Sequence, residues 1–392
     1  MSESLREKSN KRICFITTIS VTLSSFILPF AEYLHEHTSY DLTFICDNDD
    51  EFAASLPEYI HYIPIKMKRG ISLGGVVAMF KMIRIFRREK FDMVQYSTPN
   101  ASLYSAIAAW IARVNVRLYC QWGMAYVGFS GFKRKIFKCI EKLICRLSTQ
   151  IEPDSFGNLK FSHTERLYTR NKGSVIWNGS ACGVDLQKFD ITKKIIWREN
   201  IRSYYSIPND AIVLGFVGRI TRDKGINELL AAFKMFLNHN HEAYLMIVGS
   251  EEITSAVDEK LYLWAQESPS VIFCGKTDVV EQYLSAMDIY VLPSYREGFG
   301  MVVIEAEAMG IPVIVTDIPG PTDAMVPEIT GLVAKKADID SLYEAIQKLS
   351  TSNSLRTEFG IAAHNLVVNK FERETLFDYI LQDRKHLLEN SK

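Results

Sequence analysis

The sequence has no long apolar segment, no paired cysteines and no overall excess of charge. No apolar run approaches the roughly 18 to 20 residues that a membrane-spanning helix needs, and the polar stretch before Arg12 does not resemble a secretory signal peptide. The 7 cysteines are scattered without a CxxC pair, as is typical of buried thiols in a reducing compartment. We therefore expect a globular cytoplasmic protein.

Patterns typical of metal sites and nucleic-acid binding are also lacking. Asp47-Asn48-Asp49-Asp50 resembles the DxD motif that holds Mn²⁺ or Mg²⁺ beside a nucleotide sugar in some transferases, but no acid or histidine stands at matching spacing. We interpret it as a solvated turn. His35 and His37 do not share a helix face, and no basic motif interleaved with aromatics is present. We expect no metal and no nucleic-acid partner.

The net charge of −1 hides an asymmetry between the two halves of the chain. Residues 1–200 carry 28 basic against 19 acidic side chains (net +9), and residues 201–392 carry 17 against 27 (net −10). Residues 66–150 are the extreme, with 16 basic and 3 acidic side chains. The first half is therefore suited to an anionic surface.

Short apolar strands alternate with helical patterns along the whole chain, which favours two doubly wound, mostly parallel α/β sheets. The expected strands are 13–18, 41–46, 92–96, 116–121, 174–177, 211–217, 243–248, 271–274, 289–293 and 312–316. The expected helices include 26–36, 76–90, 101–113, 132–147, 226–238, 279–286, 301–309 and 340–350. Residues 191–209 break the alternation and are the predicted linker. Two such domains, facing each other, would leave a substrate cleft between them.

The segment from Glu297 to Glu305 is the most informative part of the sequence. It follows an apolar run that we interpret as a buried strand, and Gly298 and Gly300 lead into a buried helix. A glycine-containing turn at a helix start favours an anion, while two carboxylates can accept hydrogen bonds from hydroxyls. A polyol joined to a phosphate fits both features. The alternative is a buried helix with two solvated acids, although Glu305 stands among apolar residues, where an unpaired charge is costly.

Other loops at expected strand ends supply further candidates. Arg219 and Lys224 follow the first strand of the second half and could stabilise a diphosphate leaving group without a metal; a solvated surface turn is the alternative. Lys276 and Thr277 could lie near a nucleobase, or in an ordinary turn. Residues 319–323 could border the donor pocket, with Asp323 equally suited to a helix cap.

In the first half, two features suggest a phosphate or membrane contact. Hydroxyls in the stretch 17–25, including Thr18 and Ser20, could face phosphates or an acceptor, or simply cap a helix. Residues 131–146 form a basic amphipathic helix that fits an anionic leaflet, or else a core helix with a solvated basic face. Its apolar side is Phe132, Ile136, Ile140, Leu143 and Leu147, and further basic residues are Lys66, Lys68, Arg69, Lys81, Arg84, Arg87 and Arg88.

Together these motifs resemble the retaining GT-B glycosyltransferases of family 4, in particular bacterial members that build capsular, exopolysaccharide or O-antigen units. The resemblance covers most of residues 174–320. It rests on Gly218-Arg219…Lys224-Gly225, Pro293-Ser294-x-x-Glu297-Gly298-Phe299-Gly300, the Glu-x7-Glu spacing to Glu305, and Asn178-Gly179-Ser180…Gly183-Val184-Asp185…Phe189.

The resemblance implies roles for these residues. Arg219 and Lys224 would bind the diphosphate, Glu297 the hydroxyls of the transferred sugar, and Glu305 the ribose. The backbone of Phe299, Gly300 and Met301 would touch sugar and phosphate. Many relatives also carry a histidine that contacts the donor sugar, directly after the strand residues here written Leu118-Tyr119-Cys120. This chain continues with Gln121, Trp122 and Gly123, which are therefore candidates for contact with the acceptor or the donor sugar.

The resemblance also implies an organisation and a reaction. Residues 1–190 would bind the acceptor and 210–371 the nucleotide sugar, with helix 372–392 returning to the first domain. The predicted enzyme moves a hexose or N-acetylhexosamine, with retention and without a metal, from a nucleoside diphosphate, with UDP preferred, to a polyprenyl-diphosphate-linked saccharide at the inner membrane face. A sugar-nucleotide 2-epimerase and a non-catalytic sugar-nucleotide-binding membrane scaffold are the alternatives. Nothing in the sequence names the base, sugar, linkage or oligomeric state.

Overall fold

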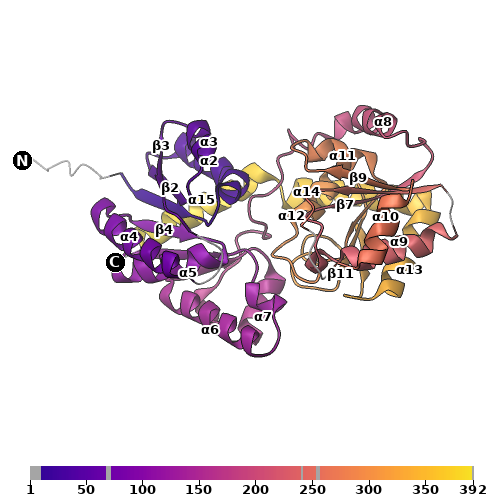
Figure 1. Ribbon diagram of the computed structural model, residues 1–392. Helices are drawn as coiled ribbons and strands as arrows, with labels where there is room; N and C mark the ends of the chain where they lie inside the picture. The colour runs from indigo at the N-terminus through magenta and orange to yellow at the C-terminus, as the bar shows by residue number, and fades with distance from the viewer. Residues whose placement is uncertain (1–9, 68–71, 240–241, 253–256, 391–392) are drawn as a thin grey trace, which may run out of the picture. The chain divides into compact units, whose positions relative to one another are not determined.

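The computed structural model describes residues 10–67, 72–239, 242–252 and 257–390, and divides the chain into two compact units (Figure 1). Unit 1 holds the chain up to Asp154, residues Leu159–Trp177, and the segment from Leu376 onward. Unit 2 holds Ser155–Asn158 and Asn178–Thr375. Each unit is built around one six-stranded sheet.

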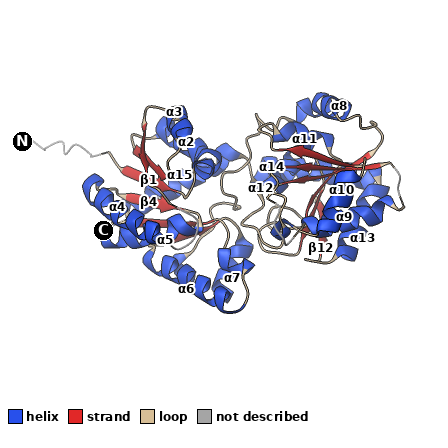
Figure 2. Ribbon diagram, viewed as in Figure 1, coloured by secondary structure: helices blue, strands red, loops and turns tan. Residues whose placement is uncertain are grey.

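The sheet of unit 1 is parallel throughout and has the strand order β3-β2-β1-β4-β5-β6. Figure 2 shows helices α2 and α3 on one side of it and α4, α5 and α6 on the other. The strands are β1 (Arg12–Ile16), β2 (Asp41–Cys46), β3 (Ile60–Pro64), β4 (Met93–Tyr96), β5 (Val116–Gln121) and β6 (Gln150–Pro153). The helices are α1 (Ser20–Thr22), α2 (Leu28–His37), α3 (Asp50–Ser55), α4 (Leu73–Glu89), α5 (Pro99–Ile111), α6 (Gly131–Leu147) and α7 (Phe156–Thr164).

The sheet of unit 2 has the order β12-β11-β10-β7-β8-β9, which repeats the topology of unit 1 when the strands are renumbered. The strands are β7 (Ile212–Val217), β8 (Ala243–Val248), β9 (Val271–Gly275), β10 (Ile289–Leu292), β11 (Val313–Thr316) and β12 (Gly331–Ala334). The helices are α8 (Lys194–Tyr204), α9 (Ile226–Leu237), α10 (Glu259–Glu267), α11 (Val280–Ala286), α12 (Met301–Ala308), α13 (Ile339–Thr351) and α14 (Asn353–Lys370). The predicted class, two doubly wound parallel sheets, is confirmed.

Apolar strands buried on both faces explain why each sheet is covered by helices on both sides. All four residues of β10 are buried, for example, as expected of a central parallel strand. One core of unit 2 lies between the sheet and α9, α10 and α13. The other lies on the opposite face, under α8, α11, α12 and α14.

Several elements differ from the expectations drawn from the sequence. Residues 174–177 do not form a strand; only Gly173 makes an isolated bridge, to Ile151 of β6. The chain passes to unit 2 after Trp177, and the segment 191–209 contains helix α8, which packs against α11. The strands β3, β6 and β12 were not expected, since their sequences are short and β3 and β6 are partly polar.

Helix α15 (Arg373–Glu389) carries the last segment of unit 1, and the fully buried Arg384 fixes it to the sheet. The guanidinium donates to both carboxylate oxygens of Glu152 in β6, at 2.5 and 3.0 Å, and to Gln95 in β4 at 3.2 Å. The nearby carboxylates of Glu152 and Asp383 raise the pKa of Arg384 in spite of its burial. The helix therefore depends on a buried charge pair with good hydrogen-bond geometry.

We predict that Arg384→Met destabilises the protein by about 3–5 kcal/mol, because it leaves the carboxylate of Glu152 buried without its counter-charge. The Tm of the variant measures the loss, and Lys385→Met, at an exposed neighbour, is the control. The double variant Glu152→Gln/Arg384→Met should recover part of the loss. If Arg384→Met were as stable as Lys385→Met, the ion pair between Arg384 and Glu152 would not stabilise the packing of α15.

Candidate donor-binding site

Three loops at one edge of the unit 2 sheet carry most of the predicted site residues. They follow the carboxyl ends of β7, β9 and β10, which lie in the order β10-β7-β8-β9. The loop after β7 holds Arg219 and Lys224, the loop after β10 holds Glu297, and the loop after β9 holds Lys276. In an open parallel sheet this edge is where ligands bind.

Lys224 and Glu297 are in direct contact. The Lys224 ammonium lies 2.5 Å from Glu297 Oε1, and the side chains are 20% and 12% exposed. The Ser294 hydroxyl donates to the same oxygen at 2.7 Å. Two residues 73 positions apart in the chain are thus joined at the adjacent ends of β7 and β10.

Glycine makes the close approach of these two loops possible. Gly225 has φ +74°, and a Cβ there would lie 2.0 Å from the carbonyl oxygen of Pro293. Any other residue at position 225 would push the β7 loop away from the β10 loop, and with it Lys224 from Glu297.

The turn before α12 is held from behind by two further contacts. Asn158 donates to the carbonyl of Gly298 at 2.6 Å. Gly320, with φ +101°, lies so close that a Cβ would be 2.1 Å from the same carbonyl oxygen. Asp323 accepts from the backbone N–H groups of Gly157, in the first turn of α7, and of Gly320. It therefore connects the loop after β11 to the start of α7 and satisfies an N–H group there, as a helix cap does.

Glu305 lies in the second turn of α12 in an environment that disfavours its charge. Burial raises the pKa of Glu305 from its ordinary value of 4.5 to about 7, while Lys188 and Arg373 act in the opposite direction. The raised pKa indicates a carboxylate that a hydrogen-bonding ligand would stabilise.

Tyr290 is a buried residue of β10 that feels the charge of both acids. Burial raises the pKa of the Tyr290 hydroxyl well above its ordinary value, and the negative charges of both Glu297 and Glu305 contribute to the rise. The hydroxyl also lies 3.4 Å from the carbonyl oxygen of Val217, at the end of β7. Both predicted acids therefore act on one buried tyrosine beside the loop that holds Lys224.

Asp223 is the carboxylate closest in effect to the basic residues of the site. Burial by itself would raise the pKa of the Asp223 carboxyl, but a hydrogen bond from Thr221 and the charges of Arg296, Arg219 and Lys224 outweigh it and lower the pKa. Arg296 lies 3.0 Å from Asp223. Arg219 itself pairs with Glu252 at 2.8 Å and is 44% exposed, so it does not contact Glu297 directly.

The remaining predicted residues of unit 2 flank this cluster. The ring of Phe299 is buried against Phe371, so only its backbone is free to meet a ligand. Gly300, with φ +89°, precedes α12, and the sulfur of Met301 lies 3.2 Å from the Ser180 hydroxyl. α12 thus begins with backbone N–H groups that have no partner inside the helix.

The loop after β9 lies farther along the same edge. Lys276 is exposed, and the Thr277 hydroxyl accepts from the backbone N–H of Val279. β9 stands three strands from β10, which is about 15 Å at the usual strand spacing. That length suits an extended ligand with a sugar at one end and a base at the other.

The predicted residues of unit 1 have internal partners. Thr18 bonds to Thr98 at 2.8 Å, and Ser20 donates to Asp49 at 2.5 Å. Neither hydroxyl caps α1, whose N-cap is Ile19 and has no side-chain bond, so the capping alternative is wrong for both. Asp49 itself caps α3, which agrees with the interpretation of the DxD-like segment as a turn.

Gln121 is fully buried, donates to Glu141 at 2.6 Å and accepts from Ser162 at 2.9 Å. Both polar atoms of the Gln121 amide are therefore hydrogen-bonded to residues inside unit 1. Trp122 packs near Phe26, with ring centroids 5.7 Å apart, and Gly123 has φ +102°.

Comparisons with known proteins agree with this arrangement. Residues 198–366 match the family model of glycosyl transferases group 1, and residues 12–155 match that of glycosyl transferase 4-like proteins. The chain is 31% identical over 370 residues to the capsular polysaccharide biosynthesis glycosyltransferase CapM of Staphylococcus aureus, covering 94% of this chain and 95% of the relative.

This chain is a group 1 (family 4) glycosyltransferase.

A further relative is the UDP-Gal:alpha-D-GlcNAc-diphosphoundecaprenol alpha-1,3-galactosyltransferase of Escherichia coli, 23% identical over 347 residues, covering 85% of each chain. Among solved structures, Anabaena Alr3699/HepE in complex with UDP and glucose matches with a TM-score of 0.78 at 18% identity, covering 96% of this chain and 100% of that one. That likeness supports a GT-B fold for the glycosyltransferase.

Reasoning from the sequence did not single out Tyr290, Asp223 or Arg296. Tyr290 is hidden inside an apolar strand pattern, and only its hydroxyl distinguishes it. Arg296 directly precedes Glu297, and this position beside a predicted site residue could have identified it as part of the site. Among the described residues, no group of three or more His, Cys, Asp and Glu side chains is arranged to hold a metal ion.

The raised pKa of Glu305 gives a prediction for the glycosyltransferase without ligand. Between about pH 4.5 and 7 the folded state binds more protons than the unfolded state, so stability falls as pH rises through this window. Glu305→Gln removes this effect and should be more stable than the parent at pH 8, by on the order of 2–3 kcal/mol, but not at pH 4.

Tm values at pH 4, 6 and 8 measure the difference. Glu344→Gln, at an exposed position of α13, is the control and should show no such trend. A Glu305→Gln variant with the same pH profile as the parent would contradict the burial of this charge.

Proposed function

We propose that this glycosyltransferase moves a hexose or N-acetylhexosamine residue from a UDP-linked donor to a polyprenyl-diphosphate-linked saccharide during surface-polysaccharide assembly. The reaction retains the anomeric configuration and needs no metal. In this proposal unit 2 binds the donor and unit 1 the acceptor, at the inner face of the plasma membrane.

The observation that carries the proposal is the contact between Lys224 and Glu297 at the carboxyl edge of the unit 2 sheet, directly before the start of α12. A cation and a carboxylate there can serve the two halves of one ligand. Lys224, Arg219 and the first N–H groups of α12 would hold the diphosphate, and Glu297 the hydroxyls of the sugar.

The chemistry needs few protein groups. The bond between the anomeric carbon and the diphosphate oxygen breaks as the bond to the acceptor hydroxyl oxygen forms on the same face, and the hydroxyl proton passes to the departing diphosphate. Lys224 stabilises the negative charge that develops on the leaving group. Glu305 would accept hydrogen bonds from the ribose, and Lys276 and Thr277 would lie near the base.

The names of the relatives support the choice of donor and acceptor. The Escherichia coli relative uses UDP-Gal and a diphosphoundecaprenol-linked sugar, the Staphylococcus aureus relative acts in capsular polysaccharide biosynthesis, and the Anabaena protein binds UDP and glucose. The same chemistry is proposed for this chain.

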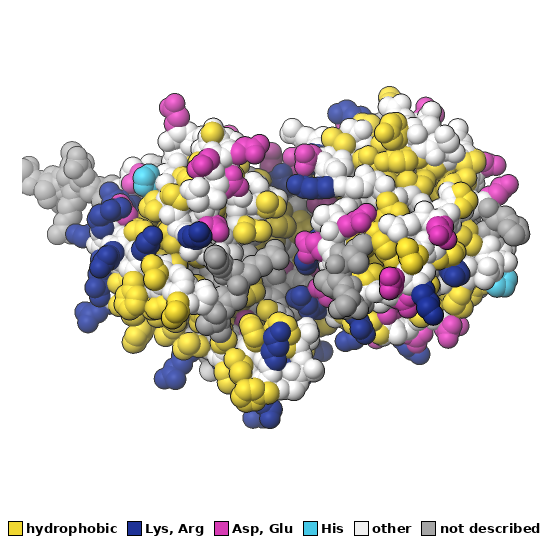
Figure 3. All heavy atoms as spheres, in the orientation of Figure 1, with side chains coloured by type: hydrophobic (Ala, Val, Ile, Leu, Met, Phe, Trp, Pro, Cys, Tyr) yellow, Lys and Arg dark blue, Asp and Glu magenta, His cyan; other side chains and the backbone are white. Residues whose placement is uncertain are grey.

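The surface of α4 and α6 in unit 1 supports the membrane contact. Both helices expose large hydrophobic side chains. The exposed fractions are 87% for Leu73, 56% for Val77, 58% for Phe80, 77% for Phe132, 42% for Ile136 and 40% for Leu143. Figure 3 shows hydrophobic side chains gathered on one side of unit 1 with basic ones beside them.

The same two helices also carry exposed basic side chains. On α4 the apolar positions 73, 77 and 80 are followed on the same face by Arg84, Arg87 and Arg88. On α6 Lys133, Lys135, Lys142 and Arg146 are exposed. Apolar residues flanked by cations suit the headgroup region of an anionic leaflet. Lys68 and Arg69, also counted among the basic residues, lie outside the described residues.

The mode of attachment would be peripheral. In the part of the chain that the structure describes, none of the helices is both long and apolar enough to cross a membrane.

We predict that Lys224→Ala lowers kcat/KM for sugar transfer by at least about a hundredfold, because the leaving diphosphate loses its main counter-charge. Release of UDP and formation of the glycosylated acceptor are both measured, and circular dichroism checks the fold. Arg222→Ala, an exposed cation in the same loop, is the matched control. Full activity of Lys224→Ala would remove the basis of the proposal, and product formed from the donor alone would point to an epimerase.

For the membrane contact, we predict that Arg87→Gln/Arg88→Gln binds liposomes containing anionic lipid about tenfold more weakly or worse, since each lost cation near the surface is worth about 1 kcal/mol. Co-sedimentation at low and high salt measures the binding. Lys335→Gln/Lys336→Gln, an adjacent exposed pair in unit 2, is the control. Equal binding by the two double variants would rule out the α4 surface as the membrane contact.

A further inference from the structure

Unit 2 contains a cavity at the edge of its sheet opposite the candidate donor site. The cavity has a volume of about 400 Å³ and is lined by α8, by the turns that precede β10 and β11, and by residues 353–365 of α14, including His364. Asp288 precedes β10, whereas Glu297 follows it. The cavity is therefore separate from the candidate donor site and has no part in the mechanism above.

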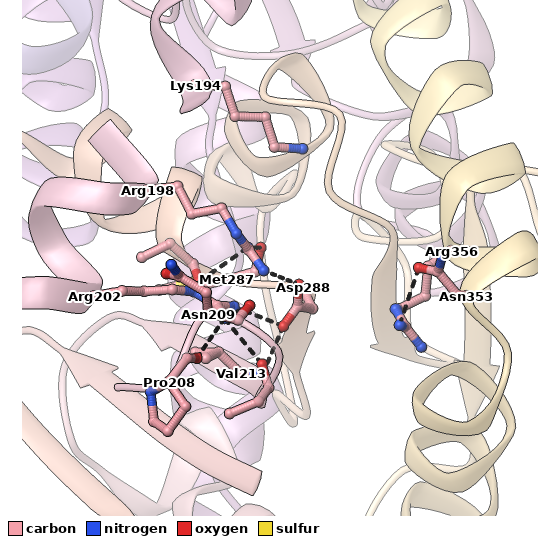
Figure 4. A network of polar contacts seen from close by, with 12 residues as sticks. Lys194, Arg198, Arg202, Pro208, Asn209, Val213, Met287, Asp288, Asn353 and Arg356 are labelled. Atoms are coloured by element: carbon pink, nitrogen blue, oxygen red, sulfur yellow. Dashed lines mark hydrogen bonds and ion pairs between the residues drawn. The ribbon is translucent and has the colours of Figure 1, made fainter. Parts of the chain in front are cut away.

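Three cationic side chains line this cavity from two helices. Lys194 and Arg198 come from α8, and Arg356 comes from α14. Figure 4 shows Lys194 and Arg198 on one side of the gap and Arg356 on the other. Asp288 is the single carboxylate among the described residues that line it.

The negative charge of Asp288 is already matched. Arg198 donates to Oδ1 at 2.7 Å, and Arg202 donates to Oδ2 at 2.8 Å. The backbone N–H of Val213 also donates to Oδ2. Arg202 is fully buried behind the cavity wall and alone balances one negative charge. Asp288 therefore does not neutralise the three cations that line the cavity.

Backbone carbonyls hold these cations in place. Lys194 donates to Gly310 at 3.1 Å, and Arg356 donates to Leu349 and Ser350, each at 2.7 Å. Arg198 reaches the carbonyls that follow α11. These carbonyls belong to the carboxyl ends of three helices, each worth roughly half a negative charge. The amino ends of α8 and α14 each contribute roughly half a positive charge, which offsets two of the three carboxyl ends. The cavity therefore keeps an excess of positive charge.

The cations also disfavour one another. Burial, followed by the charge of Arg198, lowers the pKa of Lys194 to about 8, and the charge of Asp288 only partly opposes this. Burial likewise lowers the pKa of Arg356, while the charge of Asp288 acts in the opposite direction and that of Arg198 adds to the lowering. A group of like charges held in a partly buried cavity is stabilised by a bound anion.

We propose that this cavity binds the phosphate group of a small phosphate monoester between Lys194, Arg198 and Arg356. Guanidinium and ammonium donors from two sides match the oxygens of a phosphate. The volume lies at the lower end of the range of about 300–1,000 Å³ usual for small-molecule sites. It is larger than a bare phosphate requires and leaves room for an organic group of a few carbons.

The test is calorimetric titration of the full chain with glycerol 3-phosphate, inorganic phosphate and glycerol at constant ionic strength. The Lys224→Ala variant is used, so that the candidate donor site does not contribute. We expect saturable binding of one glycerol 3-phosphate, weaker binding of phosphate and none of glycerol. Lys194→Gln/Arg356→Gln in the same background should bind at least about tenfold more weakly.

Lys193→Gln/Lys348→Gln is the matched control, because it removes two exposed cations of unit 2 outside the cavity. Unchanged affinity in Lys194→Gln/Arg356→Gln, or an equal loss in the control, would overturn the proposal. Equal affinity for phosphate and glycerol 3-phosphate would overturn the assignment to a monoester.

A second variant covers the case in which the double substitution does not fold. Thr357 lines the cavity at an exposed position of α14. Thr357→Glu places a carboxylate beside the cations, so it should raise the Tm and weaken glycerol 3-phosphate binding by about tenfold, while Thr357→Gln should do neither. Identical behaviour of Glu and Gln at this position would contradict the excess of positive charge.

Discussion

The ion pair between Lys224 and Glu297 is the constraint on which the candidate donor site depends. A carboxylate that is only 12% exposed is costly to bury unless it is paired and hydrogen-bonded, and here Lys224 and Ser294 supply both needs. The pair can form only because β7 and β10 are neighbours and because Gly225 lets their loops touch. The topology of the sheet thus brings opposite charges to one point and leaves the amino end of α12 beside them.

The two units have the same strand order but differ in what stands at the carboxyl ends of their strands. In unit 2 these loops hold oppositely charged side chains in contact, as Lys224 with Glu297 and Arg296 with Asp223 show. In unit 1 the corresponding hydroxyls and amide are bonded internally, as Thr18, Ser20 and Gln121 show. The two units therefore share one architecture but carry different side chains at the strand ends, and in the proposed function this difference separates a donor-binding unit from an acceptor-binding one.

Reasoning from the sequence recovered the elements whose local pattern is strong. Apolar runs such as 289–293 gave the central strands correctly, and the Gly-containing turn before 301–309 gave the start of α12. The strands β3 and β6 were missed because edge positions tolerate polar residues, and their sequences do not alternate clearly. Residues 174–177 look like a strand locally, but no neighbouring strand pairs with them.

Contacts that depend on tertiary structure could not be read from the sequence. Arg384 and Arg202 look like surface residues, yet both are buried beside carboxylates brought from distant parts of the chain. Gln121 was a candidate for contact with the acceptor or the donor sugar, but it is buried and donates to Glu141 of α6 inside unit 1. The partner of Lys224 lies 73 residues away, so its identity required the sheet order.

The most direct test of the central claim is a crystal structure of the protein with UDP. The account predicts that the diphosphate lies within hydrogen-bond distance of the Lys224 ammonium and the first N–H groups of α12, with the ribose at Glu305. A nucleotide bound elsewhere in unit 2, with the Lys224–Glu297 pair remote from its phosphates, would contradict the account.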